Sequence, residues 1–166
     1  MELKAPTRED VQRVRQWRNA SLETLRTPYL ISEDMQDKFY ESLQDRKSSH
    51  RYWSIYYKHE LIGFGGLTNI EWENGLAEIS LILGSSFRGK GLGRRAVNLI
   101  LDTGFGNMGL KTIYGECYEC NSAVDFWGAI TKEHGGYITT IPRRKMWQGQ
   151  LYDAVHFSIW CKSVGG

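Results

Sequence analysis

The stretch GSSFRGKGLGRR, from Gly84 to Arg95, contains four glycines and four basic residues directly before a segment with helical periodicity. A helix N-terminus leaves about four backbone N–H groups unpaired and carries a partial positive charge, and both features favour a phosphate ligand. Glycine lets the main chain approach a ligand closely and adopt conformations that other residues avoid. The stretch therefore predicts a phosphate-binding loop at the start of a helix.

Two common nucleotide-binding motifs do not fit this loop. A dinucleotide-binding loop requires G-x-G-x-x-G, whereas Gly89, Gly91 and Gly93 are evenly spaced. A P-loop requires Ser or Thr after its lysine, and here Gly91 follows Lys90. The alternative to a ligand site is a glycine-rich turn with solvated basic residues. The position of the loop between a strand and an amphipathic helix favours the ligand site.

Length and composition indicate an ordinary globular protein. The 166 residues predict a single domain, 1–166, and the formal net charge of +2 is too small to indicate nucleic-acid binding. We expect a cytoplasmic protein with no membrane span, because neither a signal peptide nor an apolar run of about 20 residues is present. Cys117 and Cys120 form a C-x-x-C without the second pair that a zinc site needs, so no metal is predicted.

The apolar periodicity predicts an α/β protein, an α+β mixed sheet with helices packed on it. The predicted order is β-α-α-β-β-β-α-β-α-β-β. After a first strand come a helix capped by Thr7, a helix opened by Ser32 with an apolar stripe of Met35, Phe39 and Leu43, strands at 51–57, 61–72 and 76–83, a helix over 91–107, a strand over 110–119, a helix over 121–134, and strands at 136–147 and 150–160.

Residues 78–94 resemble the acetyl-CoA motif of the GNAT acetyltransferase superfamily. Its signature [Q/R]-x-x-G-x-[G/A] is met by Arg88, Gly91 and Gly93, and the element order resembles the GNAT fold over nearly the whole chain. The segments VRQWRNASLETLR and RRKMWQGQLYDAVHFSIW resemble the group that includes ribosomal-protein alanine acetyltransferases and amino-sugar or sugar-nucleotide acetyltransferases.

The resemblance implies acetyl-CoA as co-substrate, without a metal. Backbone N–H groups from Arg88 through Arg94 would bind the pyrophosphate, and backbone groups of Leu81 and Leu83 would pair with the pantetheine arm after the next strand splays away. Asn121 would hydrogen-bond the same arm. The full implied set is Leu81, Leu83, Arg88, Gly89, Lys90, Gly91, Leu92, Gly93, Arg94, Asn121 and Phe126.

Acyl transfer to an amine needs a proton acceptor, and Glu78 is the candidate base. It lies mid-strand on the face opposite Ala77 and Ile79, where a carboxylate is costly unless it is paired or hydrated. A structural glutamate and an acceptor-binding glutamate remain alternatives. Trp127 occupies the position of the tyrosine that serves as acid in the family, so Tyr118 is the substitute candidate, with buried aromatic packing as its alternative.

Trp17, Arg18 and Asn19 are the candidates for acceptor binding, against core packing for Trp17 and capping or solvated roles for the other two. The resemblance implies transfer of acetyl to a primary amine, first of an amino sugar or sugar nucleotide, second of a protein N-terminus and third of a small polyamine or aminoglycoside. A non-catalytic acyl-CoA sensor is the alternative of another class. The closing hairpin is a candidate for strand pairing with a second copy, giving a homodimer.

Overall fold

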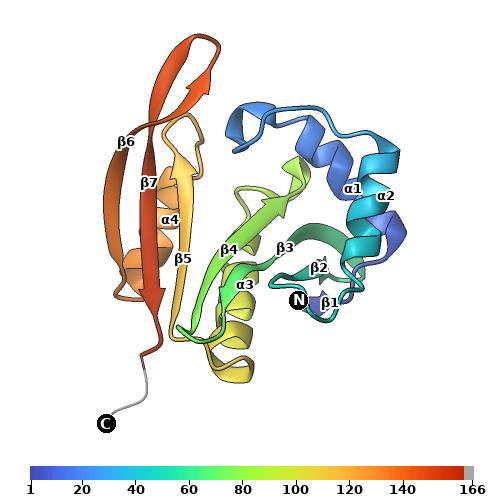
Figure 1. The fold of residues 1–166 in the computed structure, drawn as a ribbon, viewed down its shortest axis with the longest axis horizontal. Coiled ribbons are helices and arrows are strands. Elements are labelled where there is room, and N and C mark those ends of the chain that lie inside the picture. Colours follow the sequence, from blue (N-terminus) through green and yellow to red (C-terminus); the bar gives the residue numbers. More distant parts are fainter. Residues whose placement is uncertain (163–166) are drawn as a thin grey trace.

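The computed structural model describes residues 1–162, and its strands form a seven-stranded mixed sheet in the order β1-β2-β3-β4-β5-β7-β6 (Figure 1). The β4–β5 pair is parallel and the other pairs are antiparallel. The strands are β1 (Glu2–Lys4), β2 (Arg51–Tyr57), β3 (Glu60–Glu71), β4 (Leu76–Leu83), β5 (Thr112–Tyr118), β6 (Tyr137–Trp147) and β7 (Gln150–Trp160).

Helices cover both faces of this sheet. The helices are α1 (Arg8–Asn19), α2 (Glu33–Ser42), α3 (Leu92–Asp102) and α4 (Val124–Glu133), with short 3-10 turns η1 (Leu22–Thr24) and η2 (Ser85–Phe87). This order confirms the predicted fold class. Within residues 1–162, no helix combines the length and the hydropathy that a bilayer crossing requires.

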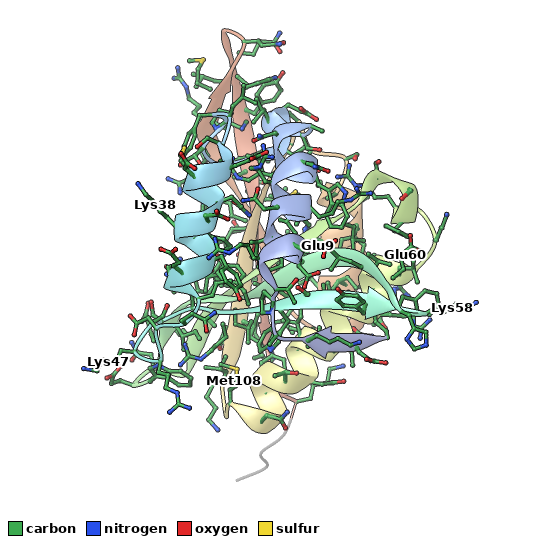
Figure 2. All side chains as sticks on the ribbon, turned by 90° about the vertical axis from the view of Figure 1, so that its right-hand side faces the viewer. Glu9, Lys38, Lys47, Lys58, Glu60 and Met108 are labelled. Atoms are coloured by element: carbon green, nitrogen blue, oxygen red, sulfur yellow. The ribbon has the colours of Figure 1, made fainter. Side chains whose placement is uncertain are left out.

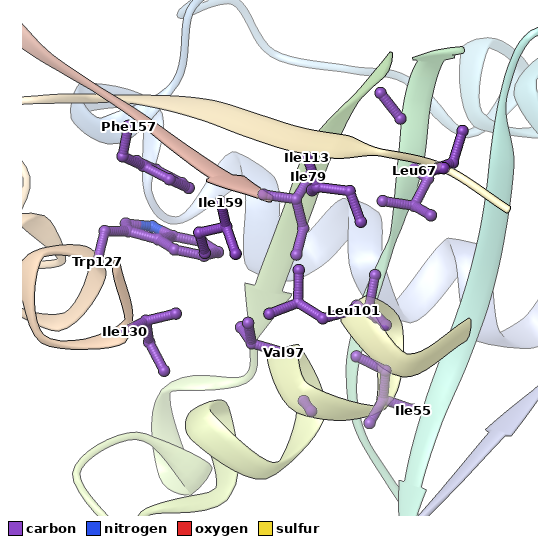
Figure 3. Close-up of a cluster of buried hydrophobic side chains, with 14 of the residues drawn as sticks. Ile55, Leu67, Ile79, Val97, Leu101, Ile113, Trp127, Ile130, Phe157 and Ile159 are labelled. Atoms are coloured by element: carbon purple, nitrogen blue, oxygen red, sulfur yellow. The ribbon is translucent and has the colours of Figure 1, made fainter. Parts of the chain in front are cut away.

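The two faces differ in the core they bury. Helices α3 and α4 pack over the larger cluster, in which Val97 and Leu101 of α3 and Trp127 and Ile130 of α4 meet side chains of the central strands (Figure 3). Helices α1 and α2 lie side by side on the opposite face (Figure 2) and bury a smaller cluster around Val11. The polar face of β4 and β5 therefore lies on the α1–α2 side.

A buried carboxylate fixes the start of α1. Thr7 and Asp10 form a capping box, in which the Thr7 N–H donates to Asp10 Oδ2 at 3.0 Å and the Asp10 N–H donates to Thr7 Oγ1 at 3.1 Å. Asp10 also accepts hydrogen bonds from the Ser54 and Tyr56 hydroxyls, both at 2.7 Å. The cap of α1 is thus attached to β2.

The structure corrects the predicted apolar stripe of the second helix. Met35 is 45% exposed, whereas Phe39 and Leu43 pack against the smaller cluster. Gln36 is buried in place of Met35, and its Nε2 donates to the Val11 carbonyl at 2.6 Å. The side-chain amide satisfies a main-chain oxygen of α1, so a polar residue is the better partner at this helix contact.

The helix predicted over 91–107 is shorter as an α-helix. It ends at Asp102 and continues as a π-helical turn over Thr103–Asn107. This turn contains two glycines, which lower helix propensity. Gly104 packs so close to the sheet that a Cβ atom there would lie 2.7 Å from Ile113 and 2.8 Å from Leu67.

Candidate functional site

The sheet opens between β4 and β5. These strands pair at only three positions, and the last pair is Glu78 with Tyr114. Beyond it, β4 continues to Leu83 beside β3, and β5 continues to Tyr118 beside β7, so the two strands diverge (Figure 1). The strand after the motif therefore splays away, as the resemblance implied.

The edge of β4 along this opening consists of main-chain groups. The Gly75 carbonyl, just before β4, accepts hydrogen bonds from the N–H groups of Lys111 at 2.7 Å and Thr112 at 3.1 Å, and so faces β5. Because main-chain groups alternate in direction along a strand, those of Leu81 and Leu83 also face the β5 side. No strand of residues 1–162 pairs with them there, so an extended ligand can hydrogen-bond this edge.

The glycine loop (residues 84–91) connects β4 to α3. Gly89 and Gly91 both have φ of +72°, a left-handed conformation that costs other residues about 1–2 kcal/mol. In the described part of the chain, the N–H groups of residues 89–94 have no hydrogen-bond acceptor. Leu92 is buried as the first residue of α3, and the side chains of Arg88, Lys90 and Arg94 are exposed.

Three of the predicted cofactor-binding residues meet at the base of this loop. A Cβ atom on Gly93 would lie 3.3 Å from Leu83 Cδ1 and 3.3 Å from the Phe126 ring. Side chains of β4 and α4 therefore touch the first turn of α3. Arg88 Nε donates to the Leu83 carbonyl at 3.1 Å, a contact that a ligand pairing with this carbonyl must replace.

Asn121 lies in the turn between β5 and α4. Its Oδ1 accepts from the Ala123 N–H at 2.9 Å, and its N–H donates to the Tyr118 carbonyl at 2.8 Å. These bonds shape the turn at the far end of the opening. The Asn121 side-chain Nδ2 has no acceptor within residues 1–162, so it can donate to a ligand there.

Glu78 projects from β4 toward the α1–α2 side, opposite the buried Ala77 and Ile79. Its side chain is 13% exposed, and Oε1 lies 2.5 Å from Arg26 Nη2. Its Oε2 accepts from Asn69 Nδ2 at 2.9 Å. A carboxylate this buried is costly unless it is paired, and these two partners stabilise it at the point where the strands separate.

Tyr118 ends β5 on the same face of the sheet and is 6% exposed. Burial raises the pKa of its hydroxyl, although the hydrogen bond with Arg26 acts in the opposite direction. Tyr118 therefore keeps its proton at neutral pH. Arg26 pairs with Glu78, and its positive charge also acts on the Tyr118 hydroxyl, so one guanidinium influences both predicted catalytic residues.

Arg26 belongs to a bridging loop (residues 22–31) that α1 holds from one side. Arg18 donates to the Tyr29 carbonyl at 3.0 Å. Asn19 exchanges two hydrogen bonds with the main chain of Ile31, at 2.9 and 3.0 Å. The polar groups of Arg18 and Asn19 therefore position this loop, and their contact with an acceptor stays a prediction.

The other side of the opening holds the same loop. Lys145 of β6 is 5% exposed and donates to the Leu25 carbonyl. The Cys120 thiol donates to the Glu23 carbonyl at 3.5 Å. The bridging loop thus spans from α1 to the β5–β6–β7 part of the sheet.

Trp17 takes the core-packing role, and its contact with an acceptor stays a prediction. Its indole packs on the smaller core cluster with Val14 and Phe64. The same ring lies against Gly84, where an added Cβ would be 2.9 Å from it. Trp17 therefore contacts the start of the glycine loop from α1.

Trp127 serves the core rather than the opening. Its indole stacks on Phe157 with ring centroids 4.7 Å apart and lies in the larger core cluster, on the face of the sheet that α3 and α4 cover (Figure 3). Glu78 projects to the other side of the sheet. The ring that stands at the family's tyrosine position is thus used for packing.

Sequence reasoning missed Arg26 and Lys145. Arg26 lies in a loop without periodicity, and nothing in the sequence links it to Glu78, 52 residues away. Lys145 did carry a signal, since strand alternation places it on the same face as the partly buried Trp147. Arg144, beside it, pairs with Glu116 of β5 at 3.3 Å.

The comparisons with known proteins agree with this geometry. The model of the acetyltransferase (GNAT) domain family matches residues 1–125 of the chain. An uncharacterized N-acetyltransferase p20 from Bacillus licheniformis is 30% identical over 108 residues, which are 64% of this chain. The match spans 59% of the length of that curated relative.

Solved structures with the same fold are spermidine N-acetyltransferases from Vibrio cholerae. The one in complex with CoA and spermine has a TM-score of 0.83 at 21% identity, covering 96% of this chain and 94% of that one. A chimera of this spermidine N-acetyltransferase with hSSAT has a TM-score of 0.81 at 23% identity, covering 96% of both chains. The fold and the family match over three quarters of the sequence lead to one conclusion: the chain belongs to the GNAT acetyltransferase family.

Proposed function

We propose that the protein is an enzyme that transfers an acetyl group from acetyl-CoA to a primary amine, by direct attack in a ternary complex. The observation that carries this proposal is the opening between β4 and β5 beside the glycine loop. The free N–H groups of residues 89–94 can bind a diphosphate, and the free edge of β4 can pair with an extended chain that contains amides. Few ligands other than acetyl-CoA contain both groups.

The placement of the thioester follows from this binding mode. A pantetheine arm along Leu81 and Leu83 leads from the glycine loop toward the last β4–β5 pair. The acetyl group then lies near Glu78, where the strands meet. Main-chain N–H groups of the β4 edge can stabilise the negative charge that develops on the thioester oxygen.

Glu78 is the proton acceptor in this proposal. A bound ammonium gives one proton to the carboxylate, directly or through water, and the free amine attacks the thioester carbonyl carbon. A C–N bond forms, the C–S bond breaks and CoA leaves as the thiolate, and the second proton of the nitrogen passes to this thiolate or to solvent. Because Glu78 is paired with Arg26, it acts as base when the acceptor shares or replaces that contact.

Tyr118 is the candidate donor to the departing thiolate. Its hydroxyl is protonated at neutral pH, because burial raises its pKa. A thiol with an ordinary pKa of about 8.5 can also leave as the thiolate. Tyr118 is therefore an accelerating group rather than an essential one.

The proposed acceptor is an amino sugar or sugar nucleotide, with a protein N-terminal amine as the second choice. The surroundings of Glu78 support an acceptor that is not a polycation, because the carboxylates of Glu78 and Glu116 are already paired with arginines. The Arg26–Glu78 pair also favours a second candidate function, a sensor that binds acyl-CoA without turnover.

One experiment separates these functions. Purified protein is titrated with acetyl-CoA by calorimetry and then incubated with acetyl-CoA and glucosamine, glucosamine 6-phosphate, spermidine or an alanine-terminal peptide. Free thiol is measured, and the product is identified by mass spectrometry. We expect acetyl-CoA binding and amine-dependent thiol release. Binding without release would favour the sensor, and no binding at millimolar acetyl-CoA would refute both.

A further inference from the structure

The charges around Glu78 are unusual for a site that receives an ammonium group. Glu78 and Glu116 are 13% and 9% exposed, and each already has an arginine partner, Arg26 at 2.5 Å and Arg144 at 3.3 Å. An incoming cation therefore finds the attraction of both carboxylates partly neutralised.

Lys145 adds a third cation on the same side of the opening. It is 5% exposed and has no carboxylate partner within residues 1–162. Its Nζ lies 4.9 Å from the ring centroid of Tyr118 and 5.6 Å from that of Trp147. The positive charge of Lys145 is thus held by the carbonyl of Leu25, the residue before Arg26, and by two aromatic rings.

Arg26 still has donors to offer. A guanidinium has five N–H groups in a planar fork. The contact with Glu78 through Nη2 uses only part of this fork, and the Arg26 side chain is 58% exposed. The free part can bind an anionic oxygen group while the guanidinium remains at Glu78.

We infer that Arg26 is a specificity-determining residue that selects a primary amine carrying an anionic oxygen group over an amine carrying further positive charge. This inference rests on the proposed acetyl transfer and narrows its acceptor class. The anionic group of the acceptor binds the free N–H groups of Arg26, and its amine lies at Glu78. A polyamine brings a second cation toward Arg26 and Lys145 and is repelled.

Acceptors that differ in charge provide the test. Glucosamine and glucosamine 6-phosphate share the amine and the ring, and spermidine adds positive charge. The ratio of kcat/KM for glucosamine 6-phosphate to that for spermidine is measured for the wild type, Arg26→Gln and Arg26→Lys. Any loss of catalytic power common to both acceptors cancels in this ratio. Arg13→Gln, an exposed site on α1, is the control.

We expect the wild-type ratio to exceed that of Arg26→Gln by about tenfold or more. Arg26 makes a charge-assisted contact with the phosphate of glucosamine 6-phosphate, whereas it repels the further positive charge of spermidine. Arg26→Lys keeps the charge but not the planar fork, so its ratio should fall between those of the wild type and Arg26→Gln. Arg13→Gln should keep the wild-type ratio. The inference is overturned if the wild type prefers spermidine, or if Arg26→Gln leaves the ratio unchanged. Binding of acetyl-CoA with no transfer to any amine would instead refute the proposed function, and the inference with it.

Discussion

The glycine loop and the bridging loop both border one opening, but they are built in different ways. The glycine loop and the first turn of α3 present main-chain N–H groups from a single run, residues 89–94. The bridging loop presents the side chain of Arg26, and its position depends on α1, the turn after β5, and β6. In the proposed function, recognition of the diphosphate is thus local in sequence, whereas recognition of the acceptor is assembled from distant segments.

This difference separates the effects expected of mutations. Side-chain changes around Glu78 should alter catalysis and acceptor choice but not acetyl-CoA affinity. Backbone changes in the glycine loop should alter acetyl-CoA affinity without changing which acceptor is preferred.

The largest effect is expected for Glu78→Gln. Removing the proposed base should lower kcat by about 10²- to 10³-fold. The dissociation constant of acetyl-CoA should change less than about twofold, because the β4 edge binds through its main chain. Steady-state thiol release and calorimetry measure the two quantities. Glu73→Gln, an exposed site, is the control, and full activity in Glu78→Gln would assign Glu78 a structural role.

Gly91→Ala tests the glycine loop against a matched control. Gly91 and Gly149 have φ of +72° and +79°, and a Cβ on either would meet no atom within 4 Å. Alanine at each position should therefore lower the free energy of unfolding by a similar amount, about 1–2 kcal/mol. Only Gly91→Ala should weaken acetyl-CoA binding, by about tenfold, since it disturbs the N–H groups of the loop. Equal affinity in both variants would count against the loop as the diphosphate site.

A smaller effect is expected for Tyr118→Phe. The hydroxyl donates to the leaving thiolate in the proposed mechanism, but a thiolate can leave unassisted, so kcat should fall by about tenfold or less. Tyr137→Phe is the control, because Tyr137 is 60% exposed on β6. A loss as large as that of Glu78→Gln would make Tyr118 an essential acid.

Asp10→Asn should affect stability alone. Burial acts to raise the pKa of Asp10, but hydrogen bonds from Thr7, Ser54 and Tyr56 outweigh it and lower the pKa below 3.8. The stability from this carboxylate is therefore present above about pH 4 and is lost as the pH falls through the folded-state pKa.

At pH 7, Asp10→Asn should lower the free energy of unfolding by about 1–3 kcal/mol, with an acid limb shallower than that of the wild type. Urea unfolding between pH 3 and pH 7 measures both. The ratio of kcat/KM for glucosamine 6-phosphate to that for spermidine should stay at its wild-type value, because Asp10 lies at the opposite end of α1 from Arg18 and Asn19. A changed ratio would show that the two regions are less separate than the structure indicates.

Much of the fold was predictable because its signals are local. Turn residues, periodicity and the signature from Arg88 to Gly93 indicate the element order and the phosphate-binding loop. The exposure of Met35 and the burial of Gln36 could not be predicted in this way, because Gln36 is buried to donate a hydrogen bond to a main-chain oxygen of α1. The partner of Glu78 was equally hidden, since the contact with Arg26 joins an irregular loop to a strand 52 residues later.

Helix α1 has one property that neither loop has alone. Near its C-terminal end it contacts Gly84 through Trp17 and anchors the bridging loop through Arg18 and Asn19. Any shift of this helix that one substrate induces is therefore passed to the site of the other. By thermodynamic reciprocity, the factor by which bound acetyl-CoA changes acceptor affinity equals the factor by which bound acceptor changes acetyl-CoA affinity.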